Sequence, residues 1–417
     1  MQRTINGVMA LVDGRFVPSD IRVDGESIVS VSPAARPLSK PFLYAMPGFT
    51  DVHVQLREPG FSYKETIRTG TLAAARGGYT AVCAMPNLDP VPDSVGHLRA
   101  QLEIIERDAV INVKPYGAIT VGEAGEALSD MDGMAKSVIA FSDDGHGVQS
   151  DDMMRTAMAK AKSLGRLIAA HCEDNRLLHG GCIHDGVWAR AHGLKGICSE
   201  SEWGQIARDI GLVRQTGCGY HVCHISTRES VALIRKAKAE GLDVSCETAP
   251  HYLLLTEDDL QDEGRFKMNP PVRERADREA LLEGLADGTV DMIATDHAPH
   301  SAEEKSKGLA GSAMGIVGLE TAFPLLYTYL VKKQKLISLE KLVELMSTAP
   351  ATRFGLDSGI RPGGPANLAL WNLDTEYEID PNDFVSMGRA TPFAGWKVNG
   401  ICKETIYQGQ TVWTADR

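Results

Sequence analysis

Side chains of the types that bind divalent metals stand directly after short apolar runs at several places in this 417-residue chain. They are His53, the neighbours Asp143 and Asp144, His171, His224 and Asp296. If those runs are parallel strands of one barrel, all of these residues lie on the same end of it, where active sites are built. Imidazoles and carboxylates without thiolates suit Zn2+, with Mn2+ or Co2+ as alternatives. Any one of these residues alone has a structural alternative, as a core histidine or a helix-capping aspartate.

The elements that must position these side chains are short β-branched runs alternating with helical stretches. Apolar residues recur at helical spacing between the runs, for example over 152–161 and 231–237. Repeated strand and helix units favour a parallel sheet, and eight of them match a closed (β/α)8 TIM barrel. The eight expected strands cover residues 49–54, 79–84, 112–118, 137–141, 166–170, 220–223, 242–246 and 290–294.

The two ends of the chain have a different pattern. Residues 1–45 and 357–417 alternate apolar and polar residues in short runs separated by turn signals. Hinge signals stand at Met46-Pro47-Gly48 and at Pro362-Gly363-Gly364-Pro365. We therefore expect both ends to form one small β-sandwich, and residues 46–356 to form the catalytic barrel.

Bulk properties exclude two classes of function. The formal net charge is −12, and no Lys/Arg-rich run offsets it, so binding to nucleic acid is not expected. No apolar run approaches the roughly 18 residues that span a bilayer, and the N-terminus lacks the features of a signal peptide. We expect a cytoplasmic protein that does not bind membranes.

One segment carries a specific resemblance. Residues 51–60, Asp-Val-His-Val-Gln-Leu-Arg-Glu-Pro-Gly, resemble the first-strand motif of the dihydroorotases, which is normally His-x-His-Leu-Arg-Glu-Pro-Gly. The likeness continues in the family's order through residues 84–87, 140–145, 170–174, 224–227, 267–271, 294–300 and 315–321. It covers essentially the whole chain and implies a barrel of the amidohydrolase type.

The resemblance implies a metal centre with Zn2+, one or two ions per chain. The ligands would be His53, Asp144, His171, His224 and Asp296, with Asp144 as the shared bridge and Asp143 as the alternative to it. Related cyclic amidohydrolases use a carboxylated lysine on the fourth strand, but residues 137–141 here are Ser-Val-Ile-Ala-Phe and contain no lysine.

The resemblance also implies a substrate and a reaction. Arg57 and Asn87 would hold the carboxylate of dihydroorotate, Asn269 would contact its ring and His300 would make a further contact. A guanidinium fork suits that anion. Metal-activated water would open the ring to carbamoyl aspartate, with Asp296 as both ligand and general base. Ring closure is the direction of pyrimidine biosynthesis. Residues 301–312 are either a lid or an exposed loop.

The main departure from the family is Gln55, which stands where the second histidine of the motif is expected. An amide oxygen is a weaker, neutral ligand, so full occupancy of one metal position is in question. Three hypotheses follow: an active dihydroorotase with an impaired or single-metal site, a silent subunit in an assembly with aspartate carbamoyltransferase, or another cyclic amidohydrolase such as an allantoinase or dihydropyrimidinase. For the first we expect a homodimer acting on a small molecule.

Overall fold

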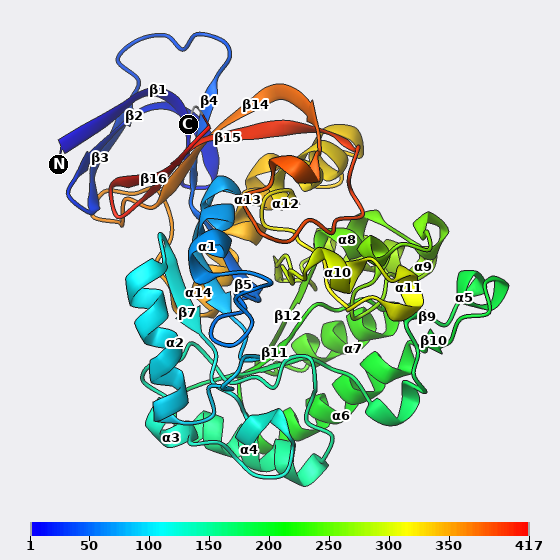
Figure 1. The fold of residues 1–417 in the computed structure, drawn as a ribbon. Coiled ribbons are helices and arrows are strands. Elements are labelled where there is room, and N and C mark those ends of the chain that lie inside the picture. Colours follow the sequence, from blue (N-terminus) through cyan, green and yellow to red (C-terminus); the bar gives the residue numbers. More distant parts are fainter. Residues whose placement is uncertain (1, 416–417) are drawn as a thin grey trace.

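The computed structural model describes residues 2–415, so Met1, Asp416 and Arg417 of the expected sandwich segments lie outside the described residues. Figure 1 shows two parts: a barrel surrounded by helices, and a sheet formed by the two ends of the chain. The blue N-terminal strands and the orange and red C-terminal strands lie together above the barrel.

The barrel consists of eight parallel positions. Two sheets supply seven of them, in the orders β5-β6-β7 and β13-β12-β11-β8. Their strands are β5 (Phe49–Val54), β6 (Tyr79–Ala84), β7 (Asn112–Pro115), β8 (Ile168–Ala170), β11 (Tyr220–Val222), β12 (Val244–Thr248) and β13 (Met292–Ile293). The eighth position is the segment around Phe141, which pairs in parallel with Gly117 on one side and Ile168 on the other. Parallel pairing of Val54 with His297 closes the ring. The expected (β/α)8 barrel is confirmed.

Two kinds of local signal form these elements. β5 and β6 are buried along their whole length, as expected for parallel strands covered on both faces. Several helices begin at a Ser or Thr whose hydroxyl accepts a hydrogen bond from the first turn, at Thr66, Ser94, Ser150 and Thr227. These caps fix where each strand-to-helix loop ends, and the loops before them carry the candidate site.

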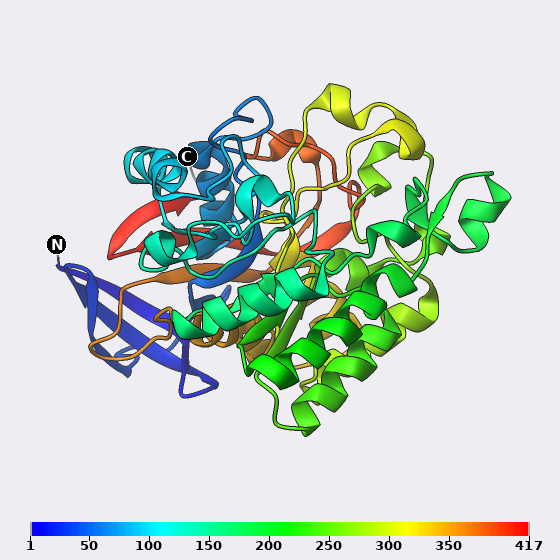
Figure 2. The same ribbon diagram turned by 90° about the horizontal axis from the view of Figure 1, so that it is seen from below.

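Helices surround the barrel. Those that follow barrel strands are α1 (Ile67–Arg76), α2 (Val95–Asp108), α3 (Met131–Met134), α4 (Asp151–Ser163), α6 (Glu200–Thr216), α7 (Arg228–Ala239), α8 (Pro250–Leu254), α9 (Arg275–Asp287), α12 (Ala322–Leu326), α13 (Leu339–Met346) and α14 (Thr348–Arg353). Figure 2 shows the green helices side by side along one flank, where α4 packs on α6, α6 on α7 and α7 on α9.

The barrel interior has its own small apolar cluster, separate from the large core between strands and helices. It includes Val52, Cys83, Tyr116, Ala140, Ala169, Cys223 and Met292. Each of these residues comes from a different position around the barrel, so the cluster fills the centre. A filled centre leaves no room for a site inside the barrel, and the active sites of such barrels lie at the carboxyl ends of the strands.

The terminal segments form one mixed seven-stranded sheet in the order β16-β15-β14-β4-β1-β2-β3. Its strands are β1 (Gln2–Val12), β2 (Arg15–Asp24), β3 (Ser27–Pro33), β4 (Leu43–Pro47), β14 (Leu368–Glu378), β15 (Lys397–Tyr407) and β16 (Gln410–Thr414). Residues of both halves share a separate apolar cluster, for example Ile21 and Val23 with Leu368 and Ile406. Both ends of the chain therefore contribute strands to a single sheet and side chains to one shared apolar cluster.

Two excursions leave the barrel near its carboxyl end. One comprises β9 (Ile183–His184), α5 (Val187–Ala191) and β10 (Gly196–Ile197), and it projects to the side in Figure 1. The other carries α10 (Ala302–Lys305) and α11 (Gly308–Gly311). No helix among residues 2–415 combines the length and apolar character needed to cross a bilayer.

Candidate metal centre and substrate cavity

His53, on β5, lies at the centre of the candidate site and is fully buried. Its Nδ1 is 2.8 Å from Oε1 of Glu247, so the ring donates there and presents Nε2 on its other side. That Nε2 has no hydrogen-bond partner, and it lies 3.4 Å from Asp144 Oδ1 and 3.5 Å from Asp296 Oδ1.

Asp144 joins the histidines into one cluster. Its Oδ1 lies 3.6 Å from His224 Nε2 and 3.8 Å from His171 Nδ1, while the two rings approach each other to 3.0 Å. Neighbouring histidines, above all His53, hold the pKa of Asp144 well below its usual range although burial opposes this. Asp144 is therefore a carboxylate.

The donor set fits a cation. Two buried atoms that face each other in this cluster, His53 Nε2 and Asp144 Oδ1, have no hydrogen-bond partner, and His224 Nε2 lies 3.6 Å from the same Asp144 oxygen. His53, Asp144 and His224 can each bring one ligand atom within 4.8 Å of the others. Buried polar atoms left unpaired are costly, and a divalent ion would satisfy them together. Nitrogen and carboxylate donors without sulfur suit Zn2+ or a similar ion.

Asp143 is directed away from this cluster. Its Oδ1 accepts hydrogen bonds from the backbone N–H groups of Ile119 (2.7 Å) and Thr120 (3.1 Å), and its Oδ2 accepts one from the Thr120 hydroxyl. These contacts fix the loop after β7 against the loop after Phe141. The geometry therefore favours Asp144 over Asp143 as a ligand.

Gln55 and Asn87 lie on the other side of Asp144. Gln55 Nε2 donates to Asp144 Oδ2 at 3.1 Å. Asn87 Nδ2 donates to Gln55 Oε1 at 3.2 Å and to Asp144 Oδ2 at 3.3 Å. The Asn87 amide nitrogen is thus engaged inside the site, and it would have to leave Asp144 to donate to a bound carboxylate.

Arg57 and His300 form the cationic part of the site. Arg57 Nε donates to Pro299 O at 3.1 Å, and Arg57 Nη2 lies 3.3 Å from His300 Nε2. Burial lowers the pKa of Arg57 to about 10, so it stays protonated at neutral pH. Burial and the adjacent Arg57 lower the pKa of His300 to about 3, so its ring is neutral.

Asn269 reaches the centre through a second carboxylate. Its Nδ2 donates to Glu173 Oε1 at 2.9 Å, and Glu173 Oε2 lies 3.4 Å from His171 Nε2. The carbonyl oxygen of Asn269 is buried and unpaired. Asn269 and Glu173 therefore orient His171, and Asn269 retains a free acceptor.

These side chains enclose a cavity of about 260 Å³. It is lined by Gln55, Arg57, Asn87, Asp144, His171, His224, Asn269, Asp296 and His300, together with residues 145–146, 298 and 314–315. The cavity is small, and its lining includes carboxylates, imidazoles, amides and the guanidinium of Arg57. It suits a small anionic molecule.

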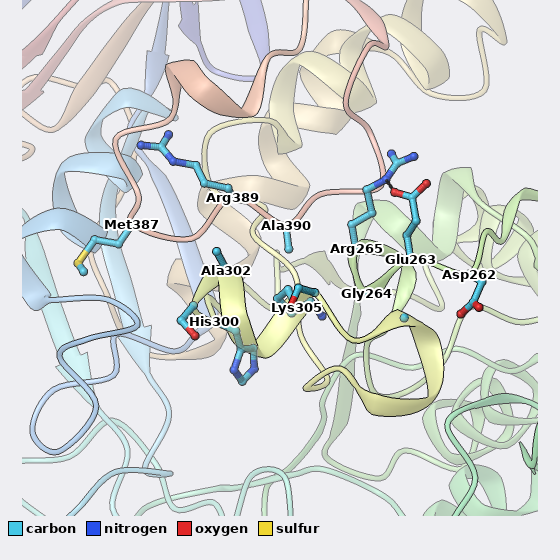
Figure 3. Close-up of a pocket in the computed structure, with 13 residues that line it drawn as sticks. Asp262, Glu263, Gly264, Arg265, His300, Ala302, Lys305, Met387, Arg389 and Ala390 are labelled. Atoms are coloured by element: carbon cyan, nitrogen blue, oxygen red, sulfur yellow. Dashed lines mark hydrogen bonds and ion pairs between the residues drawn. The ribbon is translucent and has the colours of Figure 1, made fainter.

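Residues 301–312, all of which the structure describes, do not line this cavity. Some of them line a neighbouring cavity of about 420 Å³ with Asp262, Arg265 and Met387. Figure 3 shows His300 and Lys305 at that cavity, below Ala302 and Arg389. His300 belongs to both cavities, so it is the point at which the segment meets the candidate site.

Three candidate site residues have left-handed backbone conformations: Arg57 (φ 62°), His224 (φ 33°) and Asp296 (φ 48°). Such values are uncommon outside glycine, cost on the order of 1–3 kcal/mol each, and concentrate at functional sites. Each turns the chain sharply just after a barrel strand.

Two supporting carboxylates escaped the sequence analysis. Glu247 is the charged residue of the buried strand β12 (Val244–Thr248), and Asp51 lies inside the buried strand β5. Asp51 accepts hydrogen bonds from His53 N and from both the amide and the hydroxyl of Thr295. A carboxylate within a buried parallel strand needs hydrogen-bond partners. The presence of Glu247 and Asp51 in such strands could therefore have indicated a supporting role.

The family model described as Dihydro-orotase-like matches residues 44–230. The dihydroorotase of Bacillus cytotoxicus is 52% identical over 370 residues, which cover 88% of this chain and 86% of that protein. The dihydroorotase of Bacillus cereus strain AH820 is 48% identical over 416 residues, covering 98% and 97%.

Solved structures with the same fold are more distant in sequence. The L-hydantoinase (dihydropyrimidinase) of Arthrobacter aurescens has a TM-score of 0.84 at 25% identity, with 98% of this chain and 95% of that one covered. The dihydropyrimidinase of Brevibacillus agri NCHU1002 has a TM-score of 0.83 at 21% identity, with 100% and 96% covered. The latter likeness shows the fold alone.

Proposed function

This chain belongs to the dihydroorotase family, and on that premise we propose that it catalyses the reversible hydrolysis of (S)-dihydroorotate to N-carbamoyl-L-aspartate. The observation that supports this most directly is the joint placement of Arg57 and a set of unpaired metal-ligand atoms around one small cavity. A guanidinium can hold the substrate's carboxylate while its ring amide faces the ligand cluster.

We propose Zn2+ as the ion, bound by ligands drawn from His53, Asp144, His171, His224 and Asp296. When bound, such an ion lowers the pKa of water and polarises a carbonyl oxygen. The chain's own part is to hold the ligands in place: Glu247 fixes the ring of His53, and Glu173 lies against His171.

Asp296 is our candidate for the general base. Burial raises its pKa above the usual range for an aspartate, which brings a carboxylate closer to the basicity useful in proton transfer. In ring opening it would take a proton from the attacking water and return it to the departing ring nitrogen. Ring closure reverses both transfers, so one residue serves both directions.

We assign substrate binding to the cationic part of the site, Arg57 and His300, and to the two asparagines. Arg57, still protonated, pairs with the carboxylate, and neutral His300 lies beside it as a second contact. Asn269 offers its free carbonyl oxygen to a ring N–H group. Asn87 contacts the substrate only after its amide releases Asp144, so its contribution depends on rearrangement.

The alternatives are less favoured. Relatives at about 50% identity are dihydroorotases, whereas the hydantoinases and dihydropyrimidinases match at 20–25%. A buried guanidinium beside the ligands also favours an anionic substrate over a neutral ring. Apart from Gln55, the ligand and substrate positions match those of the family, which supports an active enzyme over a silent subunit.

Location and assembly belong to the same proposal. We place the enzyme in the cytoplasm as a homodimer, with aspartate carbamoyltransferase as a candidate partner. Light scattering after gel filtration, with and without that transcarbamoylase, measures both associations. A monomer that does not bind the transcarbamoylase would contradict both proposed associations and would leave the proposed reaction unaffected.

The decisive test is carbamoyl aspartate formation from dihydroorotate, measured with elemental analysis of the same preparation. We expect turnover that chelators abolish and Zn2+ restores. Hydantoin and dihydrouracil serve as neutral competitors in parallel assays. Turnover of these rings without turnover of dihydroorotate would overturn the proposal, as would a metal-loaded protein inactive on every ring.

A further inference from the structure

The two oxygens of Asp144 face different surroundings. Oδ1 faces three imidazoles and has no hydrogen-bond partner. Oδ2 accepts hydrogen bonds from Gln55 Nε2 and Asn87 Nδ2, at 3.1 and 3.3 Å. We call Gln55 and Asn87 the amide pair. A carboxylate that bridges two ions with one oxygen on each needs both oxygens free, and here Oδ2 is engaged by two amide groups.

The chemistry of the amide pair fixes its orientation. Ionised Asp144 can only accept hydrogen bonds, so Gln55 must point its NH2 group at Oδ2. That leaves Gln55 Oε1 on the other side, where Asn87 Nδ2 donates to it at 3.2 Å. Turning the Gln55 amide over would set its oxygen against Oδ2 and its nitrogen against the Asn87 nitrogen.

Gln55 therefore presents a donor, and not a ligand atom, to the Oδ2 side of Asp144, while its oxygen accepts from Asn87. Its N–H group carries positive partial charge toward Oδ2, and Asn87 adds a second such group. A cation beside Oδ2 would have to displace both donors and would gain only a neutral oxygen in return. An imidazole at this position would instead offer a lone pair.

We propose that the centre holds a single divalent ion on the Oδ1 side of Asp144, and that the amide pair occupies the place of a second ion. The ligands of that ion come from His53, Asp144 and His224, and Asp296 is a further candidate because its Oδ1 lies 3.5 Å from His53 Nε2. This inference rests on the metal centre of the proposed function but does not depend on which ring is hydrolysed.

The experiment compares three proteins: the natural chain, Gln55→His, and a control, Gln334→His, which adds a histidine at an exposed position. Each is stripped with a chelator, dialysed and titrated with Zn2+ by calorimetry, and elemental analysis gives the ions bound per chain. Titration with Mn2+ followed by electron paramagnetic resonance distinguishes isolated ions from spin-coupled pairs. Circular dichroism confirms that each protein is folded.

We expect one ion per chain in the natural protein and in Gln334→His, with the signal of isolated Mn2+. Gln55→His should bind two, with a coupled signal at full loading. Gln55→Glu, which cannot donate to Asp144, provides a second test and should also admit a second ion. Two coupled ions in the natural protein would overturn the inference, and so would a single ion in both folded Gln55 variants.

Dihydroorotate turnover of the natural protein separates this inference from the proposed function. One ion without turnover of dihydroorotate would contradict the function and leave the inference standing. Turnover of dihydroorotate by a protein with two bound ions would support the function and contradict the inference.

Discussion

The floor and the rim of the site are built differently. The floor, defined here as Asp51, His53, Glu247 and Thr295, consists of side chains on or next to barrel strands, each at most 1% exposed. Glu247 contacts both His53, at 2.8 Å, and His221, at 3.0 Å. Burial alone would raise the pKa of Glu247, but these two histidines lower it to about 2. The floor is thus stabilised by hydrogen bonds between side chains of different barrel strands.

The rim, defined as Arg57 and residues 300–315, is held largely by backbone oxygens. Lys305 Nζ donates to the carbonyls of Lys267 (3.0 Å), Ala313 (2.7 Å) and Gly315 (2.7 Å). Arg57 donates to Pro299 O, and His300 Nε2 lies 2.8 Å from Met314 O. We therefore expect the floor to determine metal binding and the chemical step, and the rim to determine substrate affinity.

The largest effect is expected where the floor meets the cavity. Asp296→Asn keeps the shape of the side chain but cannot accept a proton, so kcat should fall by about 10²-fold or more. KM should change less than kcat, because Asp296 Oδ1 lies among the candidate ligands, 3.5 Å from His53 Nε2. Steady-state kinetics at matched metal content measure this. Retained kcat would remove Asp296 from proton transfer.

Glu247→Gln tests the floor without touching the cavity. Loss of the charged acceptor leaves the His53 ring less firmly oriented, so metal affinity should weaken by about 10- to 100-fold. Competition with a fluorescent chelator gives the dissociation constant. Ser245→Ala is the matched control, because Ser245 bonds His221 at 2.8 Å and lies one contact further from His53. Equal affinities for Glu247→Gln and the natural chain would contradict the assigned role.

Arg57→Lys tests the rim. An ammonium cannot reproduce a two-pronged contact with a carboxylate, so KM for dihydroorotate should rise by about tenfold, equivalent to roughly 1.4 kcal/mol. Metal content should not change. An altered metal stoichiometry in this variant would show that the rim also supports the ligands, and the separation of floor and rim would fail.

The same difference explains how far the sequence could be interpreted. His53, His171, His224 and Asp296 were predictable as neighbours because parallel strands end on one face of a barrel. Choosing between Asp143 and Asp144 from the residues alone was not possible, because Asp143 is engaged by Ile119 and Thr120, a contact between two loops.

Other features depend on contacts that leave no pattern in the sequence. Gln55 was expected to be a weak ligand, but its role depends on Asn87, 32 residues away. The small polar residues of 301–312 indicated either a lid or a loop, because the partners of Lys305 are backbone carbonyls, which every residue possesses. The ligands at the strand ends were therefore accessible to sequence reasoning, whereas the carboxylates that support them and the hydrogen bonds of the rim were not.

The smallest effect is expected from Lys305→Met, which keeps the length of the side chain and removes all three hydrogen bonds to carbonyls. Lys305 touches no candidate ligand and does not line the catalytic cavity, so its influence must pass through His300, Met314 and Gly315. Lost hydrogen bonds of this kind are worth about 1 kcal/mol each, and local rearrangement will recover part of that. We expect KM to rise by about threefold.

That rise should come with unchanged kcat, unchanged metal affinity and faster amide hydrogen exchange confined to residues 301–315. Lys307→Met is the matched control, since Lys307 lies in the same segment and its half-exposed side chain forms an ion pair with Glu303 at 4.0 Å. A fall in kcat for Lys305→Met at saturating substrate would mean that the segment acts on the chemistry itself. The rim would then have to be counted with the floor, because both would control the reacting groups.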